Sequence, residues 1–119
     1  MSPPQFSSLD EYLASLDDPV AATTLRSIID VVLADFPDLQ VKLAWNVPQI
    51  HRDGKYVLGL STAMNHLSIA PWSSRVMADF TARLGDYVVT PNLFHVPLDW
   101  DVDEDLLKDL VRARLAELD

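Results

Sequence analysis

The chain has 119 residues, of which 49% are hydrophobic, and its 18 acidic residues against 9 Lys and Arg give a net charge of −9. This length predicts a single domain over residues 1–119, and the hydrophobic content excludes a disordered chain. The negative charge argues against nucleic acid and membrane surfaces as partners, because phosphates attract Lys and Arg. The absence of cysteine excludes disulfides and cysteine-based metal sites.

Residues 1–7 are predicted to form a flexible arm, because two prolines and small polar side chains offer little to pack. This segment has neither the basic stretch nor the apolar run of a signal peptide. No apolar segment approaches the roughly 20 residues that span a bilayer. We therefore expect a cytoplasmic protein.

Two helices are predicted next. Ser8 and Glu11 have the spacing of a capping box, and a short helix over about 9–16 follows. Asp18 is a good N-cap and the proline after it a good first helical residue. The apolar residues that follow recur at helical spacing, which predicts a longer helix over about 19–35.

The pattern then alternates with the period of β-strands. The Asp53-Gly54 pair is a strong signal for a two-residue hairpin turn. Together these signals predict an antiparallel meander. Its expected strands are 41–45, 47–51, 56–62 and 66–70.

A third helix is predicted to have one apolar side, formed by Val76, Met77, Phe80 and Leu84, and Gly85 as the left-handed residue after its end. A last strand is expected over 93–98 and a closing helix over about 104–118. Consecutive hairpin-linked strands with helices before and after predict an α+β fold. Its antiparallel sheet would have the helices packed mainly on one face.

No segment has the full pattern of a catalytic or calcium-binding motif. Ser61 lies in a stretch similar to G-x-S-x-G, but within a hairpin strand rather than at a strand-to-helix turn. Residues 99–105 begin like a calcium loop, but the loop lacks glycine at its sixth position and glutamate at its twelfth. We therefore predict no enzymatic activity, with a paired-carboxylate hydrolase as a minor alternative.

The sheet is expected to leave one face open. If Leu67 and Ile69 point toward the helices, the residues between them point away, because strand side chains alternate. By the same reasoning Val57 and Gly59 are expected on the open face, Trp72 at its border, and His51 exposed beside its turn. The candidate ligand-binding residues of this face are Trp45, Pro48, Ser61, His66, Ser68 and His95.

Four carboxylates near the N-terminus form a candidate metal site. Carboxylates are hard oxygen ligands that suit Ca²⁺, Mg²⁺, Mn²⁺ or iron. The alternative is a solvated acidic surface. The residues are Asp10, Glu11, Asp17 and Asp18.

Five segments in a fixed order resemble the bacterial YdhG-like family, a domain of unknown function. They are Phe6–Leu16 (F-x-x-L-D-E-Y-L-x-x-L), Trp45–Pro48 (W-N-V-P), Asp53–Lys55 (D-G-K), Asn65–Pro71 (N-H-L-S-I-A-P) and Phe94–Leu98 (F-H-V-P-L). The resemblance covers about 6–118. It departs at His95, where the family often has Arg, Lys or Gln, and at Pro91-Asn92, where a glycine-containing turn is common.

The resemblance implies a frataxin-like α+β sandwich. Because at least one branch of the family is described as an intracellular iron chaperone, it also implies weak, exchangeable iron at the four carboxylates, and no other cofactor. The expected function is therefore non-enzymatic iron binding and delivery to an iron-acceptor protein. The alternative is a module that binds a small ligand or a protein on the open sheet face. A monomer and a homodimer are both compatible with the sequence.

Overall fold

The computed structural model describes residues 8–119, so the predicted arm over 1–7 lies outside the described residues. No helix among the described residues is long and apolar enough to cross a membrane. The elements in chain order are α1 (Leu9–Ser15), α2 (Pro19–Asp35), β1 (Gln40–Ala44), β2 (Val47–Arg52), β3 (Lys55–Thr62), β4 (His66–Ala70), α3 (Ser74–Asp79), the 3₁₀ helix η1 (Thr81–Leu84), β5 (Val88–Val89), β6 (Phe94–Pro97) and α4 (Glu104–Leu118).

Short polar side chains start the helices as expected. The Ser8 hydroxyl accepts a hydrogen bond from the Glu11 amide at 3.2 Å, and the Asp18 carboxylate accepts from the Val20 amide at 2.9 Å. Asp103 caps α4 in the same way. Each cap satisfies an amide that has no partner within its helix.

The six strands form one antiparallel sheet in the order β1-β2-β3-β4-β6-β5. Asp53 and Gly54 join β2 to β3 with φ angles of 51° and 84°, as a type I′ turn requires. The expected α+β fold, an antiparallel sheet with helices packed against it, is therefore confirmed.

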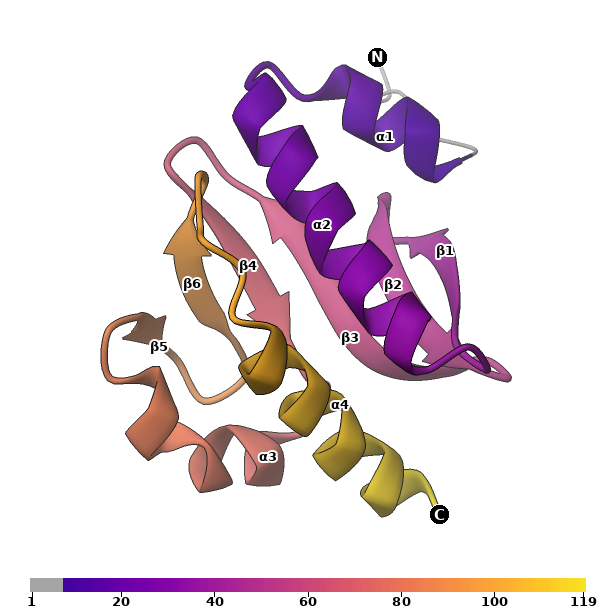
Figure 1. Ribbon diagram of the computed structural model, residues 1–119, viewed down its shortest axis with the longest axis vertical. Helices are drawn as coiled ribbons and strands as arrows, with labels where there is room; N and C mark the ends of the chain where they lie inside the picture. The colour runs from indigo at the N-terminus through magenta and orange to yellow at the C-terminus, as the bar shows by residue number, and fades with distance from the viewer. Residues whose placement is uncertain (1–7) are drawn as a thin grey trace.

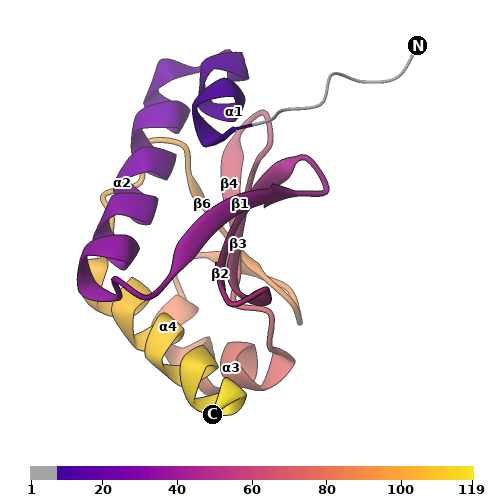
Figure 2. The same ribbon diagram turned by 90° about the vertical axis from the view of Figure 1, so that its right-hand side faces the viewer.

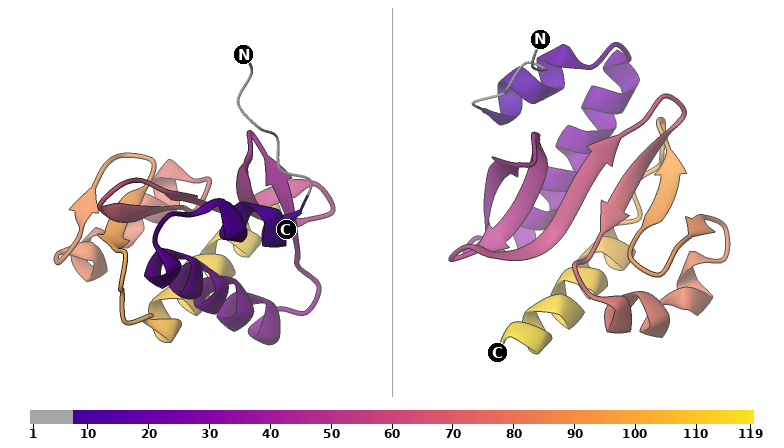
Figure 3. Two further views of the ribbon diagram at one scale, coloured as in Figure 1. Left: turned by 90° about the horizontal axis from the view of Figure 1, so that it is seen from above. Right: turned by 180° about the vertical axis from the view of Figure 1, so that it is seen from behind.

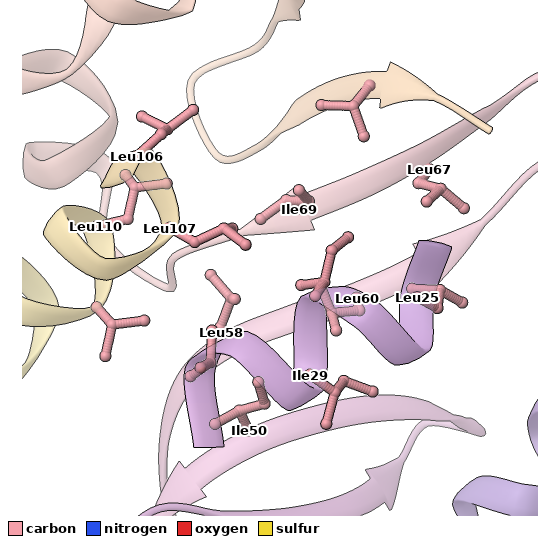
Figure 4. Close-up of a cluster of buried hydrophobic side chains, with 14 of the residues drawn as sticks. Leu25, Ile29, Ile50, Leu58, Leu60, Leu67, Ile69, Leu106, Leu107 and Leu110 are labelled. Carbon is pink, nitrogen blue, oxygen red and sulfur yellow. The ribbon is translucent and has the colours of Figure 1, made fainter. Parts of the chain in front are cut away.

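Helices α2 and α4 lie side by side across one face of the sheet (Figures 1 and 2). Their apolar stripes and the inward residues of β2, β3, β4 and β6 form the core (Figure 4). Helix α1 is tied to the far end of β3, where the Tyr12 hydroxyl and the Thr62 hydroxyl are 2.9 Å apart. The labelled core residues are Leu25, Ile29, Ile50, Leu58, Leu60, Leu67, Ile69, Leu106, Leu107 and Leu110.

The opposite face of the sheet is not covered by any described helix. Seen from this side, the strands lie in front of α2 and α4 (Figure 3, right). The side chains that point this way are those between the core positions of each strand. This open face is the surface on which the expected ligand-binding residues were placed.

Two local predictions are wrong. The third helix ends at Asp79, and the chain continues as the short 3₁₀ helix η1. Gly85 then has a φ of −60°, because a helix that tightens into 3₁₀ geometry needs no left-handed residue at its end.

The second error concerns Val57, which belongs to the core and not to the open face. The β2–β3 register shifts between Ile50 and His51, so that Ile50 pairs with Leu58 and His51 with Tyr56. The shift inserts Val57 as an extra residue and breaks the simple alternation.

Candidate functional site: the open face of the sheet

Two cross-strand rows build the centre of the open face. Gln49 pairs with Gly59, and Gly59 pairs with Ala70. In the next row Ser61 pairs with Ser68, which pairs with His95. Directly paired residues share a face, so these small and polar side chains form a continuous strip across β2, β3, β4 and β6.

One end of this strip carries three aromatic residues in mutual contact, which we call the aromatic patch: Trp45, Tyr56 and Trp72. Their ring centroids lie 5.3 Å (Trp45–Tyr56), 5.6 Å (Trp45–Trp72) and 5.1 Å (Tyr56–Trp72) apart. Trp45 is nevertheless 69% exposed and Trp72 39% exposed. Large aromatic side chains that remain exposed while fixed in place are typical of binding surfaces.

Both tryptophans have left-handed backbone conformations. The φ angle is 53° at Trp45, in the β1–β2 turn, and 57° at Trp72, after β4. A bulky side chain in this region is a genuine outlier and costs about 1–3 kcal/mol. Such strain is concentrated at functional sites, and here it affects both tryptophans of one surface.

Gly59 allows Trp72 to lie against the sheet. A Cβ atom at this position would be 2.8 Å from the Gln49 side-chain oxygen and 3.0 Å from the Trp72 ring nitrogen. The Trp72 Nε1 group donates a hydrogen bond of 2.8 Å to that Gln49 oxygen. Because Gly59 has no side chain, there is room above it for the Gln49 amide, which holds the Trp72 indole through this hydrogen bond.

The other end of the strip carries the His66 and His95 rings, which stack with centroids 3.8 Å apart and 16° between their planes. Burial lowers the pKa of His95, and the charge of His66 lowers it further. Two stacked cations would repel each other, so the arrangement favours the neutral form of His95.

The His95 pKa makes stability depend on pH in a predictable direction. As the pH falls, the His95 ring is protonated near pH 6.5 in the unfolded chain, but only at a lower pH in the folded chain. The free energy of unfolding therefore decreases as the pH drops from 6.5 toward the pKa of His95 in the folded chain. The His95→Gln variant should lose the part of this pH dependence that comes from His95. Thermal unfolding between pH 5 and 8 measures it, and an unchanged pH profile in the variant would contradict the assignment.

Charge is divided between the sheet and the rest of the molecule. The strands carry Lys42, Arg52 and Lys55 but no Asp or Glu, so all 18 acidic residues lie in helices, turns and loops. The Lys42 ammonium lies 5.2 Å from the centre of the Tyr56 ring, a cation–π contact beside the aromatic patch. Lys42 shares the open face because it pairs with Gln49, whereas Arg52 forms an ion pair of 2.7 Å with Asp119 after α4. The strands thus add no acidic residue to the open face of a strongly acidic protein.

The four carboxylates expected to bind metal have different surroundings. Asp10 forms an ion pair of 3.0 Å with Arg26, and Asp18 caps α2. Glu11 and Asp17 are exposed. Asp17 and Asp18 line a common hollow, of about 370 Å³, which lies between the α1–α2 corner and the β3–β4 hairpin.

Within residues 8–119 no group of three or more His, Asp or Glu side chains is placed to hold a metal ion. A cation at the α1–α2 corner would therefore have one or two protein carboxylates and would keep much of its water. Such coordination is weak and readily reversed.

The remaining candidates divide between the two faces. Trp45, Ser61, His66, Ser68 and His95 contribute to the open face as described above. Pro48 is buried and pairs with Leu43, and the adjacent Gln49 takes the open-face position.

Sequence reasoning missed Gln49 and Tyr56 as parts of this surface. It was also wrong about His51, which is only 9% exposed because its Nδ1 atom accepts a hydrogen bond from the Gly54 amide at 3.1 Å. A signal for Gln49 was present: an amide side chain between the apolar residues Pro48 and Ile50 of a strand needs a polar partner if it is buried.

Comparison with known proteins places the fold. No family model matches the chain. A crystal structure of a YdhG protein of the DUF1801 family from Bacillus subtilis superimposes with a TM-score of 0.85 at 24% identity, covering 92% of this chain and 89% of that one. An uncharacterised conserved protein from Lactobacillus casei gives a TM-score of 0.63 at 24% identity, covering 92% and 91%.

One curated relative carries a functional name. Over 109 residues the chain is 26% identical to the "Intracellular iron chaperone frataxin" of Bacillus subtilis (strain 168). The match covers 90% of this chain and 88% of that protein. The resemblance to YdhG-like proteins is therefore confirmed, and the chain has the YdhG-like fold.

Proposed function

We propose that this protein is a non-enzymatic iron-binding and iron-delivery protein. It holds Fe²⁺ weakly at the α1–α2 corner and presents the open sheet face to the acceptor of the iron. The observation that carries this proposal is the charge division, with all 18 acidic residues outside the strands. A carrier needs one surface that attracts a cation and another that a partner can cover without burying carboxylates.

The cargo is inferred from the relative named an iron chaperone, which matches 90% of this chain. Iron delivery needs a site that releases its ion, and one or two carboxylates completed by water satisfy this need. Asp17 and Asp18 are the best candidates of the four, because they line the same hollow and neither forms an ion pair with an arginine within residues 8–119. Asp10 is less suitable because Arg26 neutralises it.

The docking role of the open face is inferred from the aromatic patch. Trp45 and Trp72 are exposed and strained, and Trp72 is held by Gln49. Tryptophan is enriched among the residues that dominate binding energy at protein interfaces. A partner that covers the patch gains this contact without having to order the side chains first.

A second candidate function is a module that binds a protein or small ligand on this face without any iron. It is favoured by the same strained tryptophans, which do not depend on the carboxylates. Fe²⁺ binding distinguishes the two functions, since only the first requires Fe²⁺ at the α1–α2 corner.

The carboxylate assignment is tested with Asp17→Asn and Asp18→Asn in one chain. Asparagine caps a helix as well as aspartate, so α2 should remain intact. The loss of each carboxylate ligand should lower the affinity for Fe²⁺ by about tenfold or more. Anaerobic calorimetric titration measures this affinity. Asp30→Asn, an exposed residue of α2, is the matched control. Equal affinities for the double variant and the control would contradict the assignment.

A further inference from the structure

A second hollow, of about 410 Å³, lies beside the aromatic patch. It is placed where the chain leaves β4 and enters β6, two neighbouring strands whose residues Ile69 and Phe94 pair at this end. Its volume lies in the range of about 300–1,000 Å³ found for small-molecule sites. Its lining residues are Ala70, Trp72, Ser73, Ser74, Asn92 and Leu93.

The wall that leaves β4 is fixed by contacts outside the hollow. The Trp72 indole donates to Gln49 at 2.8 Å and stacks on Tyr56 with centroids 5.1 Å apart. The next residue, Ser73, donates from its hydroxyl to the Glu117 carboxylate of α4 at 2.8 Å. This wall therefore has its shape before any ligand arrives.

The opposite wall is a tight turn organised by Thr90. The Thr90 amide donates to the Leu93 carbonyl at 2.9 Å. The Thr90 hydroxyl oxygen accepts from the Leu93 amide at 3.2 Å and from the Asn92 amide at 3.3 Å. Two preorganised walls reduce the entropy lost on binding.

The lining selects for a neutral ligand with one apolar face. Trp72, Ala70 and Leu93 supply apolar surface, whereas Ser74 and Asn92 supply a hydroxyl and an amide that can donate and accept. Among the described residues, no charged side chain lines the hollow. A charged ligand would lose water there without gaining a counter-ion.

We propose that this hollow binds a neutral carbohydrate ring. The C–H face of the ring packs on the Trp72 indole, and its hydroxyl groups hydrogen-bond to the Ser74 hydroxyl and the Asn92 amide. This site uses no carboxylate of the α1–α2 corner, so it is independent of the proposed iron binding.

Amide NMR of the full chain, titrated with glucose, galactose and maltose, tests the proposal. At least one of these sugars should shift the signals of Trp72, Ser74 and Asn92 in a saturable manner. Glucuronate and glucosamine, which carry a charge on a similar ring, should bind more weakly. Failure of all three neutral sugars to bind, or equal binding of the charged ones, would overturn the proposal.

Variants assign the contacts. Asn92→Ala should lower the affinity for the sugar by about fivefold to tenfold, which corresponds to the loss of one hydrogen bond. Trp72→Ala should lower it by about tenfold or more. Val88→Ala shortens an exposed side chain that neither lines the hollow nor belongs to the aromatic patch, so it should leave sugar affinity unchanged. If Trp72→Ala disturbs the fold, the variant at the exposed Asn92 still tests the site. Loss of sugar binding in Val88→Ala, or unchanged binding in Asn92→Ala, would overturn the site. Fe²⁺ affinity should be unchanged in all three variants, which keeps this result separate from the iron proposal.

Discussion

Replacing Phe94 by alanine is expected to lower the free energy of unfolding by about 3–5 kcal/mol, the usual cost of removing a buried phenylalanine. Phe94 is fully buried at the start of β6, where it pairs with Ile69 on β4 and belongs to the hydrophobic core. A chain of this length is stabilised by only about 6–18 kcal/mol, so the loss is a large share of the total. Urea denaturation followed by circular dichroism measures it.

The adjacent residue provides the matched control. His95 lies on the same strand but on the open face, half-buried. At pH 7.5, where the ring is neutral, His95→Ala should change the free energy of unfolding by less than about 1 kcal/mol. Similar losses for the two variants would mean that both faces of β6 are packed, and the open face would not exist.

The second large effect is expected from Gly59→Val. A Cβ atom alone would approach the Gln49 oxygen to 2.8 Å and the Trp72 nitrogen to 3.0 Å, and valine adds two methyl groups. The Gln49 amide and the indole must both move, so the hydrogen bond between them breaks and the aromatic patch opens. Overpacking of this kind costs about 1–3 kcal/mol. Tryptophan emission should shift to longer wavelength as Trp72 becomes more exposed.

Gly85→Val is the control for this substitution. At Gly85 the nearest atom to an added Cβ is a backbone oxygen 4.0 Å away, and its φ of −60° suits any residue. Stability and fluorescence should therefore stay close to those of the unmodified chain. If Gly59→Val behaved like Gly85→Val, Trp72 would not rest against the sheet at Gly59.

The fold could be predicted well because its signals are local. The Ser8 and Asp18 caps, the Asp53-Gly54 turn and the alternation of β4 each depend on residues close in sequence, and the structure confirms them. Val57 shows where local reasoning ends. A β-bulge depends on how two strands align, and alternation within one strand contains no such information.

The candidate site was predicted only in part for a similar reason. The pairing of Ser61, Ser68 and His95 follows from alternation once the strands are aligned. The aromatic patch joins residues from the β1–β2 turn, β3 and the segment after β4, and two of them adopt φ angles that tryptophan rarely takes. Trp45 and Trp72 were expected at this face, but a propensity argument would place Asn or Gly at left-handed positions. Neither the backbone conformation of the two tryptophans nor their contacts with Tyr56 could therefore be anticipated.

The acidic N-terminal segment illustrates the limit for metal sites. Asp10, Glu11, Asp17 and Asp18 are close in sequence, but Arg26 pairs with the first and α2 uses the last as its cap. Proximity in sequence does not specify which carboxylates remain available to a cation. Asp17 is exposed, and Asp18 beside it caps α2 through one of its two carboxylate oxygens. The iron proposal therefore rests on these two residues and predicts only weak binding.

The most direct test of the iron proposal is an anaerobic Fe²⁺ titration of the apo-protein followed by amide NMR, with Mg²⁺ as the control ion. We predict saturable broadening confined to the α1–α2 corner and the β3–β4 hairpin, centred on Asp17 and Asp18, that Mg²⁺ does not reproduce. Broadening that spreads over all exposed carboxylates, or identical responses to the two ions, would contradict iron binding. The corner would then be a screened acidic surface, and the open sheet face would remain as the functional surface.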